Sequence, residues 1–200
     1  MKKFMDKDFL LTTETSKKLF NDYAKDCPII DYHNHLSAKE IFERRTYENI
    51  TQLWLEADHY KWRCMRANGV DEKYVTGDAT DYEKFAEFAR IMPCLIGSPV
   101  YHWAHLELQR YFGIDTPISA STCKEIWDKT KDMLQHDPEL SVRGIIKKSN
   151  VKYKGFDVYE CVLDGPKGQN IGYPVYILVK DGKYRVSDVD EALEIMGKEN

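Results

Sequence analysis

Two histidines separated by one residue, His33 and His35, are the side chains whose types and spacing are best suited to chemistry. Residues i and i+2 of an extended chain point to the same side, so both imidazoles can reach one point. A divalent metal ion at that point would lie roughly 2.0–2.1 Å from each ring nitrogen. The pattern therefore predicts two ligands of a metal site. The alternative is a solvent-exposed turn with two unrelated histidines, since short motifs often match by chance.

The residues before this pair predict the element that positions it. Pro28 ends a preceding helix, and Ile29 and Ile30 form the short apolar run that buried parallel strands show. We expect a strand over 28–33, with the two histidines at its carboxyl end. Active sites of (β/α)8 barrels lie at that end of their strands. Asp31 faces the same side and could orient one imidazole as a partner behind the metal ligands.

Length and composition bound the architecture. With 200 residues, the chain can form one domain with a hydrophobic core, or one domain and a small appendage. It is shorter than the about 250 residues of a complete barrel. Hydrophobic and charged contents of 42% and 31% are typical of a globular protein in water. A net charge of −4 without any basic run argues against a nucleic-acid partner.

The sequence also argues against a membrane or secreted location. No apolar stretch approaches the roughly 20 residues of a membrane-spanning helix, and the first residues lack the apolar run of a signal peptide. The five cysteines lie far apart without a Cys-x-x-Cys pair, as expected of reduced thiols. We therefore expect a cytoplasmic protein without a membrane partner, and a homo-oligomer is an alternative that the sequence leaves open.

Helical periodicity dominates the chain between residues 37 and 150. Apolar residues recur there at three- and four-residue steps, and short loops with proline or glycine separate the periodic segments. An earlier helix carries Leu19, Phe20 and Tyr23 on one apolar side. The helices expected after residue 37 cover 37–45, 49–68, 81–91, 100–112, 121–134 and 139–148, and a short helix or turn is expected over 71–75.

The character of the sequence changes at Val151. Residues 151–163 and 173–179 are rich in Val, Tyr, Phe and Ile, which favour strands. Asp181-Gly182 is a strong hairpin signal, and a final helix is expected over 188–196. We expect a two- or three-stranded antiparallel sheet with one helix. Because this tail contains no histidine and no phosphate-binding glycine loop, we interpret it as a packing or pairing unit.

Two long runs, DHYKWRCMRANGV at 58–70 and SPVYHWAHLELQRYFGI at 98–114, are the most distinctive stretches of the sequence. Together with the segment over 4–41 they resemble uronate isomerase (glucuronate isomerase), a family of the amidohydrolase superfamily. The His-x-His pattern alone is shared by the whole superfamily, whereas the two runs are typical of uronate isomerases. The resemblance covers about 1–152, and the β-rich tail over 153–200 matches no family pattern.

The resemblance implies a fold, a reaction and a cofactor. The chain would be α/β by ancestry, as the N-terminal portion of an amidohydrolase-type TIM barrel whose first strand ends in His33 and His35. A large helical insertion follows that strand, so we expect this chain to be mainly α with a small α+β tail. The implied reaction interconverts D-glucuronate with D-fructuronate, and D-galacturonate with D-tagaturonate. The implied cofactor is a divalent metal, Zn²⁺, with His33 and His35 as ligands.

The resemblance also places Tyr60 at a position that approaches the hexuronate substrate from the insertion. A phenol there can donate to, or exchange a proton with, a sugar oxygen. Arg63 lies one turn further along and suits the substrate carboxylate, as does Arg66. The alternatives are a core tyrosine on an amphipathic helix and a solvated face for the arginines.

A second pair of histidines, His102 and His105, lies three residues apart and could share a helix face. A metal pair is conceivable there. Trp103, Leu106 and Leu108 surround the two histidines in sequence and favour packing instead.

The family pattern stops near Lys152 in this sequence, before the strands that carry the remaining groups of the family site. Those groups are a further metal-binding histidine, a late aspartate and arginines for the carboxylate. We therefore expect the chain to be an incomplete or inactive isomerase that binds zinc weakly. Two alternatives stay open: a non-catalytic interaction or scaffold protein derived from the N-terminal region of the isomerase, and a truncated or chimeric gene product.

Overall fold

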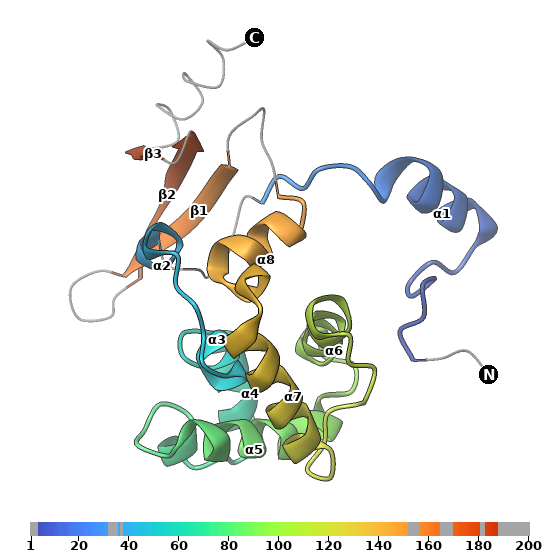
Figure 1. The fold of residues 1–200 in the computed structure, drawn as a ribbon. Helices are drawn as coiled ribbons and strands as arrows, with labels where there is room; N and C mark the ends of the chain where they lie inside the picture. Colours follow the sequence, from blue (N-terminus) through green and yellow to red (C-terminus); the bar gives the residue numbers. More distant parts are fainter. Residues whose placement is uncertain are drawn as a thin grey trace. The chain divides into compact units, whose positions relative to one another are not determined.

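Figure 1 shows the computed structural model of the chain as a ribbon. The described residues belong to two compact units, one formed by 1–34 with 149–200 and the other by 35–148. The residues that the structure describes are 4–31, 36, 38–151, 157–164, 170–180 and 183–187.

The unit of residues 35–148 is helical, as its periodicity predicts. Its α-helices in the described residues are α2 (Ala38–Glu43), α3 (Ile50–Trp54), α4 (His59–Ala67), α5 (Asp81–Ile91), α6 (Pro99–Phe112), α7 (Cys123–His136) and α8 (Val142–Lys148). Short 3-10 turns lie between them at η2 (Glu72–Tyr74), η3 (Met92–Leu95) and η4 (Pro138–Leu140).

Side-chain caps fix where several of these helices begin and end. The Thr80 side chain accepts a hydrogen bond from the Glu83 N–H and the Glu83 side chain accepts from the Thr80 N–H, a capping box at the start of α5. The Ser98 hydroxyl accepts from the Val100 N–H at the start of α6. Gly113 ends α6 with φ of 63°, a left-handed conformation that glycine adopts without strain.

The single helix expected over 49–68 is two helices, so that prediction is wrong in this detail. The helix α3 ends at Trp54 and α4 begins at His59. The break forms because Asp58 caps α4, with its Oδ1 accepting a hydrogen bond from the Tyr60 N–H at 2.9 Å. The apolar spacing runs unchanged across the break, and for this reason periodicity did not reveal it.

An aromatic cluster forms the core of the helical unit. The ring centroid of Trp54 lies 6.2 Å from that of Phe88 and 6.5 Å from that of Phe85, and Phe85 lies 5.8 Å from Trp127. Each of the first three side chains is buried almost completely. The rings come from α3, α5 and α7, which contact one another and lie side by side in Figure 1. Tilted and edge-on ring pairs of this kind add to the free energy of apolar burial.

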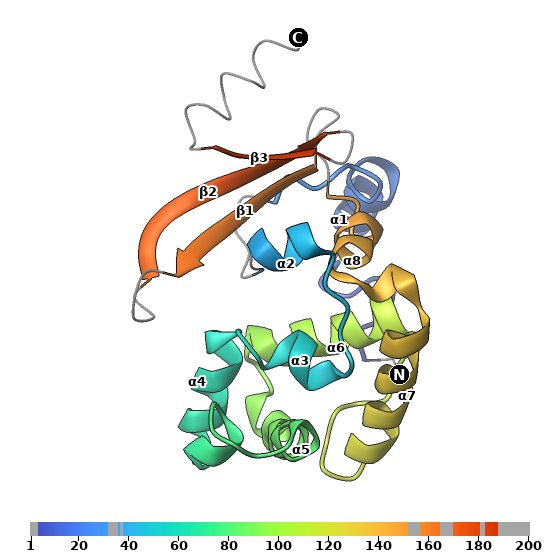
Figure 2. The same cartoon turned by 60° about the vertical axis from the view of Figure 1, so that its left-hand side comes forward.

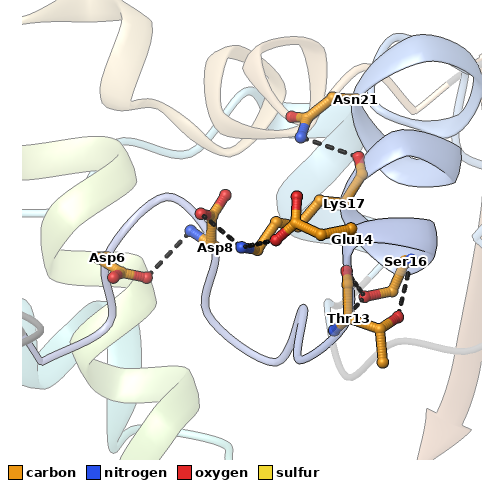
Figure 3. A network of polar contacts seen from close by, with 7 residues as sticks. All are labelled: Asp6, Asp8, Thr13, Glu14, Ser16, Lys17 and Asn21. Atoms are coloured by element: carbon orange, nitrogen blue, oxygen red, sulfur yellow. Dashed lines mark hydrogen bonds and ion pairs between the residues drawn. The ribbon is translucent and has the colours of Figure 1, made fainter.

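The N-terminal segment forms α1 (Glu14–Leu19), which continues into a π-helical turn, η1 (Phe20–Ala24). The Thr13 side chain accepts from the Ser16 N–H, and the Ser16 side chain accepts from the Thr13 N–H. Figure 3 shows this capping box together with Lys17, whose ammonium lies 2.7 Å from Glu14 and 3.9 Å from Asp8. The polar side of this helix is therefore satisfied by contacts within the segment itself.

The strand expected over 28–33 is described only as far as Asp31. Within the described residues it forms one parallel bridge, between Ile29 and Val151, in which the Ile29 N–H donates to the Asn150 carbonyl at 2.8 Å. Ile29 and Ile30 are exposed, so the expectation of a buried strand is wrong for this chain. The reason is that a single parallel bridge, unlike a full sheet, does not bring other elements over the side chains of Ile29 and Ile30.

The tail forms a three-stranded antiparallel sheet in the order β1-β2-β3, as predicted. Figure 2 shows β1 (Asp157–Asp164), β2 (Asn170–Lys180) and β3 (Lys183–Ser187) side by side. The register shifts once between β1 and β2 near the end of β1. The Asp181-Gly182 turn and the final helix expected over 188–196 lie outside the described residues.

The aromatic core generates a prediction for stability. Phe88→Ala should lower the free energy of unfolding by about 3–5 kcal/mol, because it removes a buried ring and leaves a cavity. Ile96→Ala is the matched control, since Ile96 is 72% exposed, and it should change the stability by no more than about 0.5 kcal/mol. Urea unfolding followed by circular dichroism measures both. Equal effects of the two substitutions would contradict the assignment of the core.

Candidate active site

The first turn of α4 presents polar side chains to solvent. Its capping residue Asp58 fixes the backbone at Tyr60, and both His59 and Tyr60 are exposed. Their ring centroids lie 4.5 Å apart. The alternative of a core tyrosine is therefore wrong, and the phenol of Tyr60 is accessible to a ligand in this structure.

Arg63 lies beside Tyr60. Its guanidinium carbon is 5.8 Å from the centre of the Tyr60 ring, within the range of a cation–π contact. Arg63 is exposed as well. The structure thus brings together the two side chains predicted to contact substrate, a phenol and a guanidinium at the start of one helix.

Arg66, the other arginine of α4, is held elsewhere. Its Nε donates to Glu72 Oε2 at 2.8 Å and its Nη2 donates to Glu72 Oε1 at 2.6 Å. These hydrogen bonds, with one from the Thr76 hydroxyl, lower the pKa of Glu72 to about 2. Arg66 is therefore engaged in a two-point ion pair, and it is a weaker candidate for a substrate carboxylate than Arg63.

Lys61 lies on the opposite side of the same turn and is buried. Its ammonium donates to Asp58 Oδ2 at 2.8 Å and lies 5.7 Å from the centre of the Trp54 ring. The carboxylate of Asp58 thus accepts hydrogen bonds from the Tyr60 backbone and from the Lys61 side chain at the same time. The buried cation fixes the cap, and the cap fixes the backbone at Tyr60.

A cavity of about 300 Å³ lies beside this cap and is lined by Lys61, Glu107, Trp54 and Tyr111 among others. Among the residues that the structure describes, none accepts a hydrogen bond from the buried indole N–H of Trp54. Burial raises the pKa of Glu107, while Lys61 and the nearby Trp54 indole oppose the shift. Sequence reasoning missed Glu107, because it stands between two leucines in a helix expected to pack.

A second ion-pair group lines the same cavity. Arg45 pairs with both Glu40 and Glu56, and its guanidinium carbon lies 5.0 Å from the centre of the Tyr47 ring. Burial, followed by the negative charge of Glu40, raises the pKa of Tyr47. Tyr47 therefore stays protonated at neutral pH and can act there as a hydrogen-bond donor.

His105 has a structural role, as the surrounding apolar residues predicted. It is buried, its Nδ1 lies 2.6 Å from the Tyr101 carbonyl, and its Nε2 accepts from the Ile118 N–H at 2.9 Å. Both ring nitrogens are used, so Nδ1 carries the proton and donates it. Burial lowers the pKa of His105, which keeps the ring neutral.

The predicted metal ligands His33 and His35 lie outside the described residues. Among the residues that the structure describes, no group of three or more His, Cys, Asp or Glu side chains is placed to hold a metal ion. In the same part of the chain, no helix is long and apolar enough to cross a membrane.

The cavity beside the cap generates a prediction for pH dependence. Because its pKa is raised in the folded chain, Glu107 binds a proton there more readily than in the unfolded chain. Stability should fall as the pH rises from the ordinary carboxyl value of 4.5 through the raised value. Glu107→Gln removes this titration, so the stability of the variant should depend less on pH in that range.

Urea unfolding at a series of pH values measures the difference. Glu125→Gln is the matched control, because Glu125 is an exposed residue of α7, and it should leave the slope unchanged. Parallel curves for wild type and Glu107→Gln would contradict the prediction.

Comparison with known proteins places the chain among uronate isomerases. The Caldanaerobacter subterraneus subsp. tengcongensis uronate isomerase is 59% identical over 152 residues, which are 76% of this chain and 32% of that protein. The Bacillus licheniformis uronate isomerase is 53% identical over 200 residues, 98% of this chain and 40% of that protein. The second alignment therefore extends into the tail over 153–200. The chain spans 32% and 40% of the length of these two relatives.

Two solved structures share the fold of about three quarters of the chain. The uronate isomerase from Thermotoga maritima superposes with a TM-score of 0.70 and 40% identity, covering 76% of this chain and 33% of that one. The glucuronate isomerase from Caulobacter crescentus gives a TM-score of 0.65 at 23% identity, covering 74% and 33%. A family model described as glucuronate isomerase matches residues 1–157. Because that match takes in most of the sequence, the chain belongs to the glucuronate isomerase (uronate isomerase) family.

Proposed function

We propose that the chain carries the N-terminal part of a uronate isomerase site, for a reaction that interconverts D-glucuronate with D-fructuronate and D-galacturonate with D-tagaturonate. The observation that supports the proposal most directly is the exposed pair Tyr60 and Arg63 at the capped start of α4. Descent from an amidohydrolase-type barrel and a cytoplasmic location are parts of the same proposal. The partner of the site is a small hexuronate, without nucleic acid or membrane.

The chemistry of the reaction fits the two side chains. Aldose–ketose isomerisation moves a proton between adjacent carbons through an enediolate, so it needs an acid, a base and a group that stabilises the oxyanion. The phenol of Tyr60 can donate a hydrogen bond or a proton to a sugar oxygen. Arg63 can bind the hexuronate carboxylate through two N–H groups, the geometry that guanidinium favours. In this arrangement Tyr60 contacts a sugar oxygen and Arg63 contacts the carboxylate, and both side chains come from the start of α4.

His33 and His35 would hold a divalent metal, Zn²⁺ in this proposal. When bound, such an ion would stabilise negative charge on a substrate oxygen. Two imidazoles fit the donor preference of zinc, but a catalytic zinc site usually has three protein ligands. The described residues offer no group of three candidate ligands, so the remaining ligands must come from outside them.

A second candidate function is a non-catalytic interaction or scaffold protein, which could include a homo-oligomer. The observation that favours it is the order of the tail sheet, in which β1 and β3 each have a neighbour on one side only within the described strands. Such edge strands can pair with another chain. Loss of a stable dimer on deletion of residues 153–200 would support this alternative.

The proposed site predicts weak hexuronate binding and little turnover by the isolated chain. Nuclear magnetic resonance titration with D-glucuronate should shift the signals of α4, because Tyr60 and Arg63 contact the sugar. A ketose assay should find little or no product, since the chain lacks most of the length of its relatives. Arg63→Ala should abolish the shifts. The matched control Arg66→Ala should keep them, because Arg66 is held by Glu72.

Two results would contradict the prediction of weak hexuronate binding through Arg63 and little turnover. Equal loss of binding in Arg63→Ala and Arg66→Ala would remove the special role of Arg63. Robust ketose formation by the chain alone would show that its site is complete.

The metal ligands predict weak zinc binding. After gel filtration in zinc-free buffer, the chain should retain well under one zinc ion per molecule, because two histidines hold the ion poorly. Elemental analysis of the wild type and of the His33→Ala/His35→Ala double variant measures this. One tightly held zinc ion per chain, lost in the double variant, would reveal a complete site with ligands that we have not identified.

A further inference from the structure

The cavity of about 300 Å³ beside the Asp58 cap lies within the helical unit. The described residues that line it all belong to 35–148, so this one unit builds its walls. Tyr60 and Arg63 are not among those residues. The cavity therefore differs from the surface proposed to bind hexuronate. Its volume falls at the lower end of the range of small-molecule sites.

The lining of this cavity carries an excess of negative charge. Ion pairs engage both of its cationic side chains with three of its four carboxyl groups. The fourth carboxyl group, that of Glu107, forms no ion pair with the residues that the structure describes. When all are ionised, two negative charges are left uncompensated. The carboxyl groups are those of Glu40, Glu56, Asp58 and Glu107, and the cations are Arg45 and Lys61.

Glu107 is the group in this cavity that most needs a partner. It is half-buried, and burial raises its pKa because the charged form loses solvation. A cation beside Glu107 would favour the ionised carboxylate, which has room for several hydrogen bonds. The carboxylate could then also accept the hydrogen bond that the buried indole N–H of Trp54 lacks among the described residues.

The walls of the cavity are largely aromatic. They include the rings of Tyr47, Trp54, Tyr111 and Phe112. Such rings cover the alkyl part of a ligand, and their faces attract positive charge. Two of them already lie near a cation of the chain itself, at 5.0 Å for Tyr47 and 5.7 Å for Trp54. A ligand that suits this lining combines an apolar body with positive charge.

Other classes of ligand fit the lining less well. An anion such as a hexuronate would meet the excess of negative charge and be repelled. A metal ion needs several ligands at one point, and the described residues offer no group of three or more His, Cys, Asp or Glu side chains placed to hold one. A neutral polyol could form hydrogen bonds, but it would leave Glu107 without an opposite charge.

We propose that this cavity binds a small aliphatic diamine, with one ammonium group donating hydrogen bonds to the Glu107 carboxylate and the alkyl chain lying against the aromatic walls. The two positive charges of a diamine match the two uncompensated negative charges of the lining. The proposal assigns a second ligand site to the chain. It does not rest on the proposed function, because neither Tyr60 nor Arg63 takes part.

Putrescine is the probe for the test. The full chain is titrated with it at neutral pH and low salt, where charge pairs are screened least. Isothermal titration calorimetry should show one-to-one binding. Butanediol has the same carbon chain with hydroxyl groups in place of the amines, and it should bind about 10-fold more weakly or less, because it forms no charge-assisted hydrogen bond. In nuclear magnetic resonance spectra, putrescine should shift the indole N–H signal of Trp54, which Trp54→Phe identifies.

Two variants test the role of the cavity. Glu107→Gln should weaken putrescine binding about 10-fold or more, because it removes the carboxylate that pairs with the ammonium group. Glu125→Gln is the matched control, since it removes one negative charge from an exposed position of α7, and it should bind like the wild type. Ala57→Trp keeps every charged group in place. Because Ala57 lines the cavity at an exposed position, the larger side chain should fill the cavity and abolish binding.

Circular dichroism checks that each variant is folded, and Ala57→Trp decides the matter if Glu107→Gln does not fold. Any of four results would overturn the proposal. Putrescine does not bind the wild type, or butanediol binds as tightly as putrescine. Alternatively, Glu107→Gln and Glu125→Gln weaken binding equally, which would indicate a general effect of surface charge. Finally, Ala57→Trp binds like the wild type, which would place the ligand outside the cavity.

Discussion

One carboxylate, that of Asp58, determines how the candidate site is built. Its two oxygens accept from the Tyr60 backbone and from the Lys61 ammonium. The first hydrogen bond starts α4 and separates it from α3. The second requires a buried cation at a point where the aromatic core begins, because Lys61 lies over the Trp54 ring. A single turn of helix therefore has one side fixed in the core and the other side, with Tyr60 and Arg63, exposed.

This arrangement explains which parts of the structure the sequence could predict. Helices were predictable where their apolar residues meet the core, as for Phe85 and Phe88 on α5. Tyr60 fits the same apolar spacing as Trp54 and yet is exposed, because α3 ends at Trp54 and α4 starts as a separate helix capped by Asp58. Periodicity measures the spacing of apolar residues along one helix, and it carries no signal for a cap that interrupts the helix between two of them.

The candidate site was predictable only in part, for a related reason. Tyr60 and Arg63 entered through resemblance, and their proximity in space follows from their spacing on one helix. Glu107 belongs to another helix, and its altered pKa comes from the cavity that α3, α4 and α6 enclose together. No local pattern marks it, because a glutamate between two leucines is ordinary on a helix surface. Groups whose properties arise from three elements at once need the tertiary structure to be found.

The two units differ in how much of their apolar surface is buried by their own residues. The helical unit buries Trp54, Phe85 and Phe88 and caps several of its helices within 35–148. The N-terminal segment also caps its helix, but it leaves Leu19, Phe20 and Tyr23 of α1 and η1 exposed. Hydrogen bonds of a short helix close locally, whereas apolar burial needs area from another layer. Residues close in sequence therefore suffice to cap α1, whereas the Ile29–Val151 bridge joins residues far apart in the chain and depends on the fold of the whole unit.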